Sequence, residues 1–370
     1  MTLTPVEVRH HIHKNPEIAF QEIETTKFIE EQINKLAQKY NFNLKIFKPL
    51  ETGLIVEYKK NDGEYTIFRA DIDALAIDED TECDFKSING KMHACGHDIH
   101  CAILYGFLER VLQKNINKNI LFVFQPAEEG GGGAKLMLDT GFFDNYKIDS
   151  AYAIHVTDDY PIGNIATKKG IIFASAMEIN ADFYGESAHC AFPHEGRNAL
   201  NALRTFLDEV DRMPKNPEIP FVFAPGVVEA GEVRNIIPAI AKLKGTLRSL
   251  KAEYTEFYYN KLKEIADKSA KMHNCESQVY MGSFYAEVDN DEKLFEKHKN
   301  LFESKYNFKD AAFKFVGEDF GFFSKKYQSL LLWLGTLEDK KYGLHNKKFL
   351  PSDKVIEIGI NAFEDIVESI

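Results

Sequence analysis

The chain has 370 residues, a length that predicts two domains at roughly 100–200 residues each. Its 57 acidic side chains outnumber 45 basic ones and give a formal net charge of −12. Nucleic acids and anionic membranes select clustered Lys and Arg, so this balance argues against a general binder of either. The best apolar run, Leu330–Leu334, is far shorter than the roughly 18 residues of a membrane span.

The N-terminal segment and the cysteine usage predict a cytoplasmic protein. The first residues lack the apolar stretch of a secretory signal. The cysteines form an odd and widely spaced set: Cys83, Cys95, Cys101, Cys190 and Cys275. A disulfide framework is therefore not expected, and any special cysteine is predicted to be a metal ligand or a nucleophile.

Helical and strand-like patterns alternate in the first part of the chain, which is typical of an α/β domain. Helical spacing runs from about Pro5 to Tyr40, and a second helical pattern follows His97. Short apolar runs predict buried strands of a central sheet at 53–58, 65–70, 120–125 and 151–156.

The pattern changes near Gly170, where apolar and polar residues begin to alternate as in a half-buried antiparallel strand. Strands are predicted at 177–183, 241–250 and 277–281, and helices at 199–213 and 252–273. A βαββαβ order of this kind resembles a ferredoxin-like module. After Asp289 the first pattern returns, with an apolar run at 330–335 and a C-terminal helix at 355–367.

We therefore expect an α/β catalytic domain with a mixed central sheet flanked by helices, formed by residues 1–169 and 283–370. A smaller ferredoxin-like α+β domain, residues 170–282, is expected to interrupt it. The change of pattern at the two junctions carries this expectation.

The segment His93–His100 is the densest chemical cluster, with three histidines, one cysteine and one aspartate. Thiolate and imidazole ligands favour a divalent ion such as Zn²⁺, Ni²⁺, Co²⁺ or Mn²⁺ over Mg²⁺ or Ca²⁺. The alternative is a helix start with polar caps and a buried thiol, and for a single Cys or His it would be preferred. Cys95 and His97 share one turn where their side chains can converge, which favours the metal site.

Two adjacent carboxylates, Glu128 and Glu129, follow the predicted strand at 120–125 and precede four glycines. Neighbouring side chains at a strand end point in different directions, so one can bind a metal while the other faces the substrate. A general base must lie close to the water whose pKa a metal has lowered. A solvated acidic turn is the alternative for an isolated Glu-Glu pair.

Further polar residues stand at strand ends. Asp71 and Asp73 follow the strand that ends at Ala70, His155 ends another strand, and His345 follows the last one. In open α/β sheets, sites form at the carboxyl ends of the strands. Each histidine alone is better explained as a core residue with satisfied hydrogen bonds, but together these residues favour one shared site.

Five blocks of the sequence resemble a known family: Arg9–Glu17, Arg69–Leu75, Met92–His100, Gln125–Gly130 and Gly317–Gly321. The family is that of the dinuclear metallo-amidohydrolases, which includes aminoacylases, hippurate hydrolases and indole-acetyl-amino-acid hydrolases. The likeness covers essentially the whole chain. The stretches 163–170, 317–323 and 332–335 look most like the family's bacterial N-acetyl-diaminopimelate deacetylase branch.

The resemblance implies two divalent transition-metal ions, of uncertain identity among Zn, Mn, Co and Ni. Their implied ligands are Cys95, His97, Glu129, His155 and His345. Glu128 would be the proton acceptor and Asp71 the catalytic carboxylate that supports the metal site. The sequence leaves two points open: Asp73 competes with Asp71 for that role, and Glu128 and Glu129 could exchange base and ligand roles.

The resemblance also implies that the inserted domain is a lid through which two chains form a homodimer. His189 would reach the partner's active site, and Asn235 and Arg248 would contact the substrate. Cys190 departs from the family, which usually has a small apolar residue there.

The implied activity is removal of the acetyl group from N-acetyl-L,L-diaminopimelate, which gives acetate and diaminopimelate for lysine biosynthesis. The small-molecule substrate would be the only partner besides the second chain, with no nucleic acid and no membrane. Three alternatives stay open: a broader N-acyl-amino-acid hydrolase, such as a hippurate hydrolase or aminoacylase, a metal-dependent binding protein without turnover, and a hydrolase with Cys95 as nucleophile.

Overall fold

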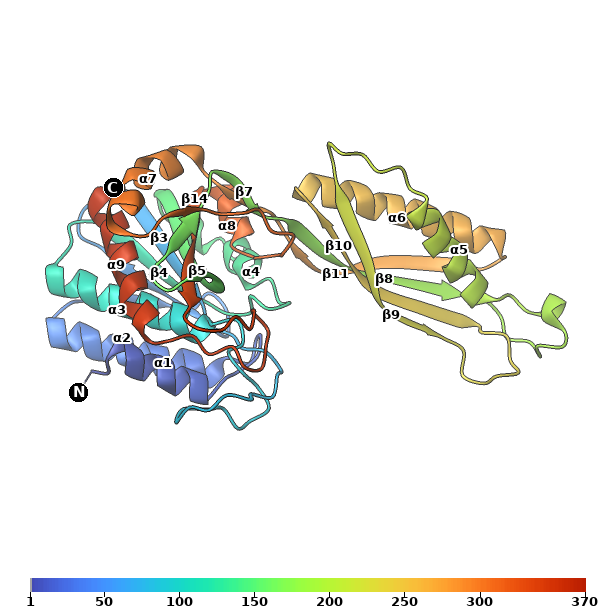
Figure 1. The fold of residues 1–370 in the computed structure, drawn as a ribbon, viewed down its shortest axis with the longest axis horizontal. Helices are drawn as coiled ribbons and strands as arrows, with labels where there is room; N and C mark the ends of the chain where they lie inside the picture. Colours follow the sequence, from blue (N-terminus) through green and yellow to red (C-terminus); the bar gives the residue numbers. More distant parts are fainter. Residues whose placement is uncertain (1) are drawn as a thin grey trace. The chain divides into compact units, whose positions relative to one another are not determined.

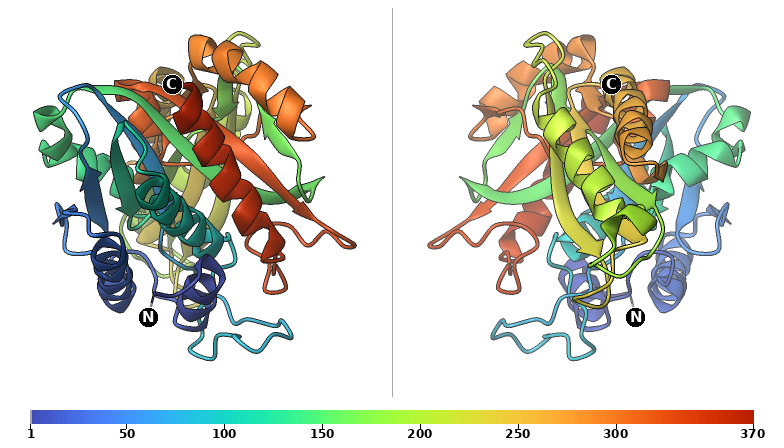
Figure 2. Two further views of the ribbon diagram at one scale, coloured as in Figure 1. Left: turned by 90° about the vertical axis from the view of Figure 1, so that its left-hand side faces the viewer. Right: turned by 90° about the vertical axis from the view of Figure 1, so that its right-hand side faces the viewer.

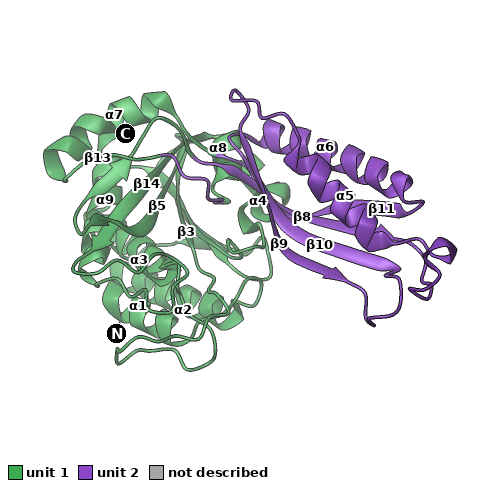
Figure 3. Cartoon of the chain, turned by 45° about the vertical axis from the view of Figure 1, so that its right-hand side comes forward, with its two compact units in different colours: residues 1–172, 288–312, 319–370 green, residues 173–287, 313–318 purple. Residues whose placement is uncertain are grey.

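The computed structural model describes residues 2–370, which separate into two compact units (Figure 3). Unit 1 comprises residues 2–172, 288–312 and 319–370, and unit 2 comprises residues 173–287 and 313–318. None of the helices among residues 2–370 is long and apolar enough to span a bilayer.

The division differs from the expected boundaries in three places. Unit 2 begins at residue 173 instead of residue 170. Unit 2 runs to residue 287 because its last strand continues to Tyr285, beyond the short apolar run visible in the sequence. Residues 313–318 also join unit 2, where the Ala174 N–H donates to the Lys314 carbonyl and Gly317 packs closely against Tyr285. Such contacts between distant segments leave no periodic signal in the sequence.

Unit 1 is built on a mixed sheet of eight strands, as the sequence predicts for the fold class (Figure 1). The strand order is β1-β2-β4-β3-β5-β14-β6-β13, with β4, β3, β5 and β14 parallel at its centre. The strands are β1 (Lys45–Phe47), β2 (Leu54–Tyr58), β3 (Tyr65–Asp71), β4 (Asn119–Gln125), β5 (Ile148–Pro161), β6 (Ile165–Thr167), β13 (Lys309–Asp310) and β14 (Gln328–Leu337). The short strands β7 (Gly170–Phe173) and β12 (Val288–Asn290) pair separately.

Helices cover both faces of this sheet, because its central strands are apolar on both sides. One face packs its core against five helices: α1 (Pro5–Lys14), α2 (Ile23–Tyr40), α3 (His97–Lys114), α7 (Glu292–Lys305) and α9 (Lys354–Ser369). The short helices α4 (Gly133–Asp139) and α8 (Gly321–Lys326) contact β4 and β14, and the 3-10 turn η1 (Phe142–Asn145) follows α4. Figures 1 and 2 show α3 and α9 side by side.

The single helical pattern expected from Pro5 to Tyr40 forms two helices. Thr4 and Glu7 begin α1 with a capping box, and Pro5 occupies the first turn, where its missing N–H costs nothing. Pro16 disfavours helical backbone at the preceding residue, and Phe20 adopts a positive φ of 62°. The chain therefore leaves α1 after Lys14 and begins α2 at Ile23.

Unit 2 has the βαββαβ order of a ferredoxin-like module. Its elements are β8 (Ser175–Tyr184), the 3-10 turn η2 (Pro193–Glu195), α5 (Ala199–Asp211), β9 (Phe221–Ala230), β10 (Ile240–Ser249), α6 (Ala252–Met272) and β11 (Glu276–Tyr285). The antiparallel sheet has the order β11-β8-β10-β9, and α5 and α6 share its apolar core. The strand β9 was not predicted, because its apolar run is interrupted by Pro225 and Gly226 and does not alternate with polar residues.

Two glycines allow α3 and α9 to pack closely in unit 1. A Cβ atom on Gly359 of α9 would lie 2.4 Å from Ile103 Cδ1, and one on Gly106 of α3 would lie 2.3 Å from Ile360 Cδ1. We expect overpacking in Gly359→Ala to lower the free energy of unfolding by about 1–3 kcal/mol. The better helix propensity of alanine would offset up to about 1 kcal/mol of this loss. Urea denaturation measures this loss.

A double variant isolates the cause. If the clash with Ile103 is responsible, Gly359→Ala combined with Ile103→Val costs less than the sum of the two single variants. Strictly additive losses would contradict the packing explanation.

Candidate metal centre

Side chains from four separate segments of unit 1 converge near the carboxyl ends of β3 and β4. His155 lies within β5, which continues to Pro161, and not at the end of a strand as the sequence suggests. The possible ligand atoms of Cys95, His97 and His155 lie within 4.8 Å of one another, as do those of Cys95, Glu129 and His345. Cys95 Sγ lies 3.5 Å from His155 Nε2, and His345 Nε2 lies 3.0 Å from Glu129 Oε1. The structure thus brings together all five residues that the resemblance named as metal ligands.

A glycine positions the first two of these side chains. Gly96 separates Cys95 from His97, the first residue of α3, and has a φ of 85°. A Cβ atom at this position would lie 2.3 Å from Val156 Cγ2, so the turn packs directly on β5. The close approach places Cys95 and His97 beside His155.

Backbone carbonyl groups orient two of the imidazoles. His97 Nδ1 lies 2.9 Å from the Asp73 carbonyl oxygen, and His155 Nδ1 lies 2.8 Å from the Val156 carbonyl oxygen. A carbonyl oxygen only accepts hydrogen bonds, so both Nδ1 atoms carry the proton and both Nε2 atoms face the cluster. His97 Nε2 is buried without a hydrogen-bond partner among the described residues. An imidazole oriented in this way is the usual arrangement of a histidine that binds a metal.

Asp73 fixes the turn that carries the two glutamates. Its carboxylate accepts the N–H groups of Glu128 and Glu129 at 3.1 and 2.9 Å. Buried Glu22 accepts the adjacent Ala127 N–H at 2.8 Å, and burial together with the charge of Asp73 raises the pKa of Glu22 to about 7. Three consecutive N–H groups of this turn are therefore bound to carboxyl groups beneath it.

Asp71 has different contacts, all of them through its side chain. It lies between the Arg69 guanidinium, at 2.8 Å, and His100 Nδ1, at 2.6 Å, and its Oδ2 is 3.7 Å from His97 Nε2. Burial raises the pKa of Asp71, but the charges of His97, Arg69 and His100 outweigh burial and hold this pKa well below its usual range. Asp71 is thus an anion beside the ligand cluster, whereas Asp73 supports the turn.

The fifth ligand candidate, His345, stands on a loop anchored to the same sheet. Its N–H donates to the Ala94 carbonyl at 2.8 Å, next to Cys95, and its φ is 62°. Asp158, near the end of β5, accepts the N–H groups of Tyr342 and Gly343, each at 2.7 Å. His345 is half exposed, so the cluster is open to solvent on this side.

The charges of the cluster require a cation. Burial and the carboxylates of Glu129 and Glu128 raise the pKa of Cys95 well above its usual value. A thiol in this state is a poor nucleophile, which argues against the cysteine-nucleophile alternative. A divalent ion would deprotonate the thiol, neutralise the carboxylates and give His97 Nε2 a binding partner. The residues present therefore fit Zn²⁺, Mn²⁺, Co²⁺ or Ni²⁺.

A buried network next to the cluster supports it, and no role was predicted for its residues from the sequence. Arg69 donates to Gln125 at 2.8 Å and to Asp319 at 2.6 Å, and Asp319 also accepts the Ala134 N–H at 2.9 Å. Asp319 belongs to the Gly317–Gly321 block and Gln125 to the Gln125–Gly130 block, so both stood in motifs without an assigned role. Only the ion pair with Arg69 shows what they do.

In unit 2 the three expected substrate-binding residues do not lie together. The Cys190 N–H donates to the Asn235 carbonyl at 2.9 Å, and His189 pairs with Ile236 in an isolated bridge, so His189 and Asn235 are neighbours. Arg248 stands near the other end of β10 and donates to Thr246. The eight residue-to-residue steps from Ile240 to Arg248 span about 26 Å along the strand.

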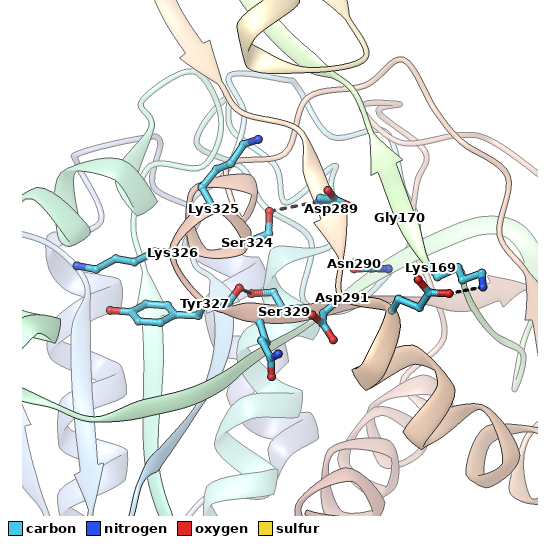
Figure 4. Close-up of a pocket in the computed structure, with 12 residues that line it drawn as sticks. Lys169, Gly170, Asp289, Asn290, Asp291, Ser324, Lys325, Lys326, Tyr327 and Ser329 are labelled. Carbon is cyan, nitrogen blue, oxygen red and sulfur yellow. Dashed lines mark hydrogen bonds and ion pairs between the residues drawn. The ribbon is translucent and has the colours of Figure 1, made fainter.

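A polar cavity of about 620 Å³ lies elsewhere in unit 1 (Figure 4). It is lined by Gln328 and Ser329 at the amino end of β14, whereas the ligand cluster lies at the carboxyl ends of the parallel strands. Two contacts lie along its lining: Lys169 forms an ion pair with Glu292, and Ser324 Oγ accepts the Asp289 N–H. This cavity therefore offers none of the chemistry of the cluster.

Residues 67–369 match the peptidase family M20/M25/M40. The chain belongs to this family. Among its curated relatives is an N-acetyldiaminopimelate deacetylase from Oceanobacillus iheyensis, 36% identical over the full length of both chains. A protein of the same name from Listeria monocytogenes is 35% identical over 98% of each chain.

Solved structures of M20-type proteins share the fold. A dinuclear metal-binding M20 peptidase from Bacillus subtilis, YXEP, is 26% identical, with a TM-score of 0.81 over 99% of this chain and 98% of that one. A putative aminohydrolase from methicillin-resistant Staphylococcus aureus is 25% identical, with a TM-score of 0.88 over 98% and 95% of the two chains.

The single tryptophan of this M20 protein, Trp333, can report metal binding. Its ring lies edge-on to His155 with centroids 5.1 Å apart. We expect Co²⁺ or Ni²⁺ to quench the fluorescence of metal-free protein, since a paramagnetic ion on His155 would lie beside the only indole. The quenching should saturate with the stoichiometry of binding and disappear in His155→Ala. Unchanged emission during proven metal uptake would place the ions elsewhere.

Proposed function

We propose that this M20 protein is a metal-dependent amidohydrolase that releases acetate from N-acetyl-L,L-diaminopimelate. The names of the full-length relatives at 35–36% identity support the substrate. The convergence of Cys95, His97, Glu129, His155 and His345 beside Glu128 supports the chemistry, and it is the observation that carries the proposal.

In this proposal the five converging residues hold two divalent ions. When bound, the ions acidify a water molecule and polarise the amide carbonyl of the substrate. Glu129 contacts His345 and so serves as a ligand. Glu128 Oε2 lies 3.9 Å from His97 Nε2, at the edge of the same cluster, and serves as the general base.

The surrounding residues give Glu128 a fixed position. Asp73 holds its backbone N–H, and Glu22 holds that of Ala127. Glu128 would accept a proton from the attacking water and pass it to the leaving amine, a role that needs a carboxylate whose position does not drift. Asp71 would support the metal site as the carboxylate beside His97, and it also accepts the Nδ1 proton of His100.

The proposal includes a second chain for substrate binding by unit 2. Asn235 and its neighbour His189 precede β10, and Arg248 stands near the end of this strand. The strand from Ile240 to Arg248 alone spans about 26 Å, too far for one small molecule to touch both ends. A homodimer through unit 2 would supply one end from each chain. The edge strand β9 supports this assembly, because an exposed ten-residue edge is a template for pairing. Sedimentation velocity on the purified chain tests the dimer.

A cytoplasmic location is part of the proposal. All five cysteines are free thiols in the structure, as expected in a reducing compartment. The acidic chain and its small-molecule substrate call for no nucleic-acid or membrane partner.

The variant Glu128→Gln tests the base. The amide keeps the size of the side chain but cannot accept the proton, so turnover should fall by about 10²–10⁴-fold. Metal content should stay unchanged, whereas Glu129→Gln should also lose metal because it removes a ligand. If Glu128→Gln turns over at a near-normal rate, Glu128 has no part in the reaction.

A substrate panel tests the substrate. Acetate release is measured from N-acetyl-L,L-diaminopimelate and N-acetyl-methionine, and benzoate release from hippurate. Each assay is run with and without Mn²⁺ or Co²⁺. We expect the highest kcat/KM with the diaminopimelate derivative, loss of activity with a chelator and recovery with added ion. A preference for hippurate or N-acetyl-methionine would favour a broader aminoacylase-like enzyme, and inertness on the whole panel would favour a binding protein.

A further inference from the structure

A second group of ligand-type atoms lies in unit 1 outside the proposed catalytic cluster. Nε2 of His13, a carboxylate oxygen of Glu79 and Sγ of Cys83 lie within 4.8 Å of one another. His13 Nε2 is 3.1 Å from Glu79 Oε1, and Cys83 Sγ is 3.9 Å from the same oxygen. The three residues come from α1 and from the segment 76–91, which contains no helix or strand.

The imidazole of this group is oriented by a buried carboxylate. His13 Nδ1 lies 2.9 Å from Asp98 Oδ2, which also accepts Arg9 Nε at 3.0 Å. Asp98 is buried and accepts from both Arg9 and His13. It fixes the proton on Nδ1 and turns Nε2 toward Glu79, as carboxylates do for histidines that bind zinc.

The other two groups are equally well placed. The Ser87 N–H donates to Glu79 Oε2 at 2.7 Å, while Oε1 faces His13 and Cys83 and also accepts the Thr81 hydroxyl. The Glu79 side chain is buried, whereas Cys83 is partly exposed and gives an ion access from solvent. One imidazole, one thiol and one carboxylate form a donor set that zinc uses, with water as a fourth ligand.

We propose that His13, Glu79 and Cys83 form a peripheral binding site for Zn²⁺ or a similar divalent ion. Binding releases the Nε2 proton of His13 and the thiol proton of Cys83 and changes no oxidation state. The ion would tie α1 to the segment 76–91. That segment is closed by the Leu75–Met92 bridge and leads directly into Cys95, so the site would stabilise the approach to the catalytic turn.

The alternative is an ion pair that needs no metal. Burial lowers the pKa of His13, but Asp98 and Glu79 outweigh burial and raise it to about 9, so a proton occupies Nε2 when no ion is bound. The ion pair explains His13 and Glu79 and leaves Cys83 in two long contacts, with its Sγ 3.9 Å from Glu79 Oε1 and 3.7 Å from Thr81 Oγ1. The two possibilities differ in what zinc does to the reactivity of this thiol.

Alkylation of the full-length protein separates them. Iodoacetamide is added with and without excess Zn²⁺, and the modified cysteines are identified by peptide mass spectrometry, which distinguishes Cys83 from Cys95. We expect zinc to slow the alkylation of Cys83 by about tenfold or more, because a coordinated thiolate is protected. An unchanged rate at Cys83 would overturn the site.

Two variants make the test specific. Glu79→Gln removes the anionic ligand and should abolish protection of Cys83, whereas Glu82→Gln removes the same charge from an exposed neighbour on the same turn and should preserve it. Cys83→Ser should bind one equivalent of Zn²⁺ fewer than the unmodified chain. Equal zinc content in the two proteins, or protection that survives Glu79→Gln, would contradict the proposal.

Discussion

Several carboxylates lie close together at the carboxyl ends of the parallel strands of unit 1. The arrangement of the surrounding residues depends on compensating this negative charge. Asp71, Asp73, Glu128 and Glu129 lie within a small buried region that also contains the Cys95 thiol. Carboxylates this close are costly unless positive charge compensates them. Arg69 neutralises part of the charge on the side of β3, and His97 and His155 direct their Nε2 atoms at the cluster. Bound metal cations would supply the rest of the compensating positive charge.

Two layers of residues form the cluster, one that supplies donor atoms and one that positions them. The inner layer offers sulfur, nitrogen and oxygen donors. The outer layer fixes them: Asp73 and Val156 orient imidazoles, Glu22 and Asp73 hold the glutamate turn, and Asp158 anchors the loop of His345. Because so many contacts are to backbone groups, the positions of the donors depend on strand ends and turns, not on flexible side chains.

The same logic, with fewer members, governs the peripheral group at His13. A buried carboxylate again orients an imidazole, and a backbone N–H again holds a glutamate. The difference is that His13 has a partner for each nitrogen without a metal, whereas His97 Nε2 has none among the described residues. The chemistry of the two places is therefore related but separately testable.

The sequence alone determined the α/β class and the change of pattern near Gly170, because periodicity is a local property, and the resemblance of its motifs named the candidate donor residues. The sequence did not separate Asp71 from Asp73, since both follow the same apolar run. The groups that distinguish them, His100 beside Asp71 and the glutamate turn at Asp73, come from other segments. It also missed β9, which has no alternating pattern, and the transfer of residues 313–318 to unit 2, which depends on contacts with residues far along the chain. Tertiary structure decided these points, because hydrogen bonds and charge pairs between remote segments leave no period in the sequence.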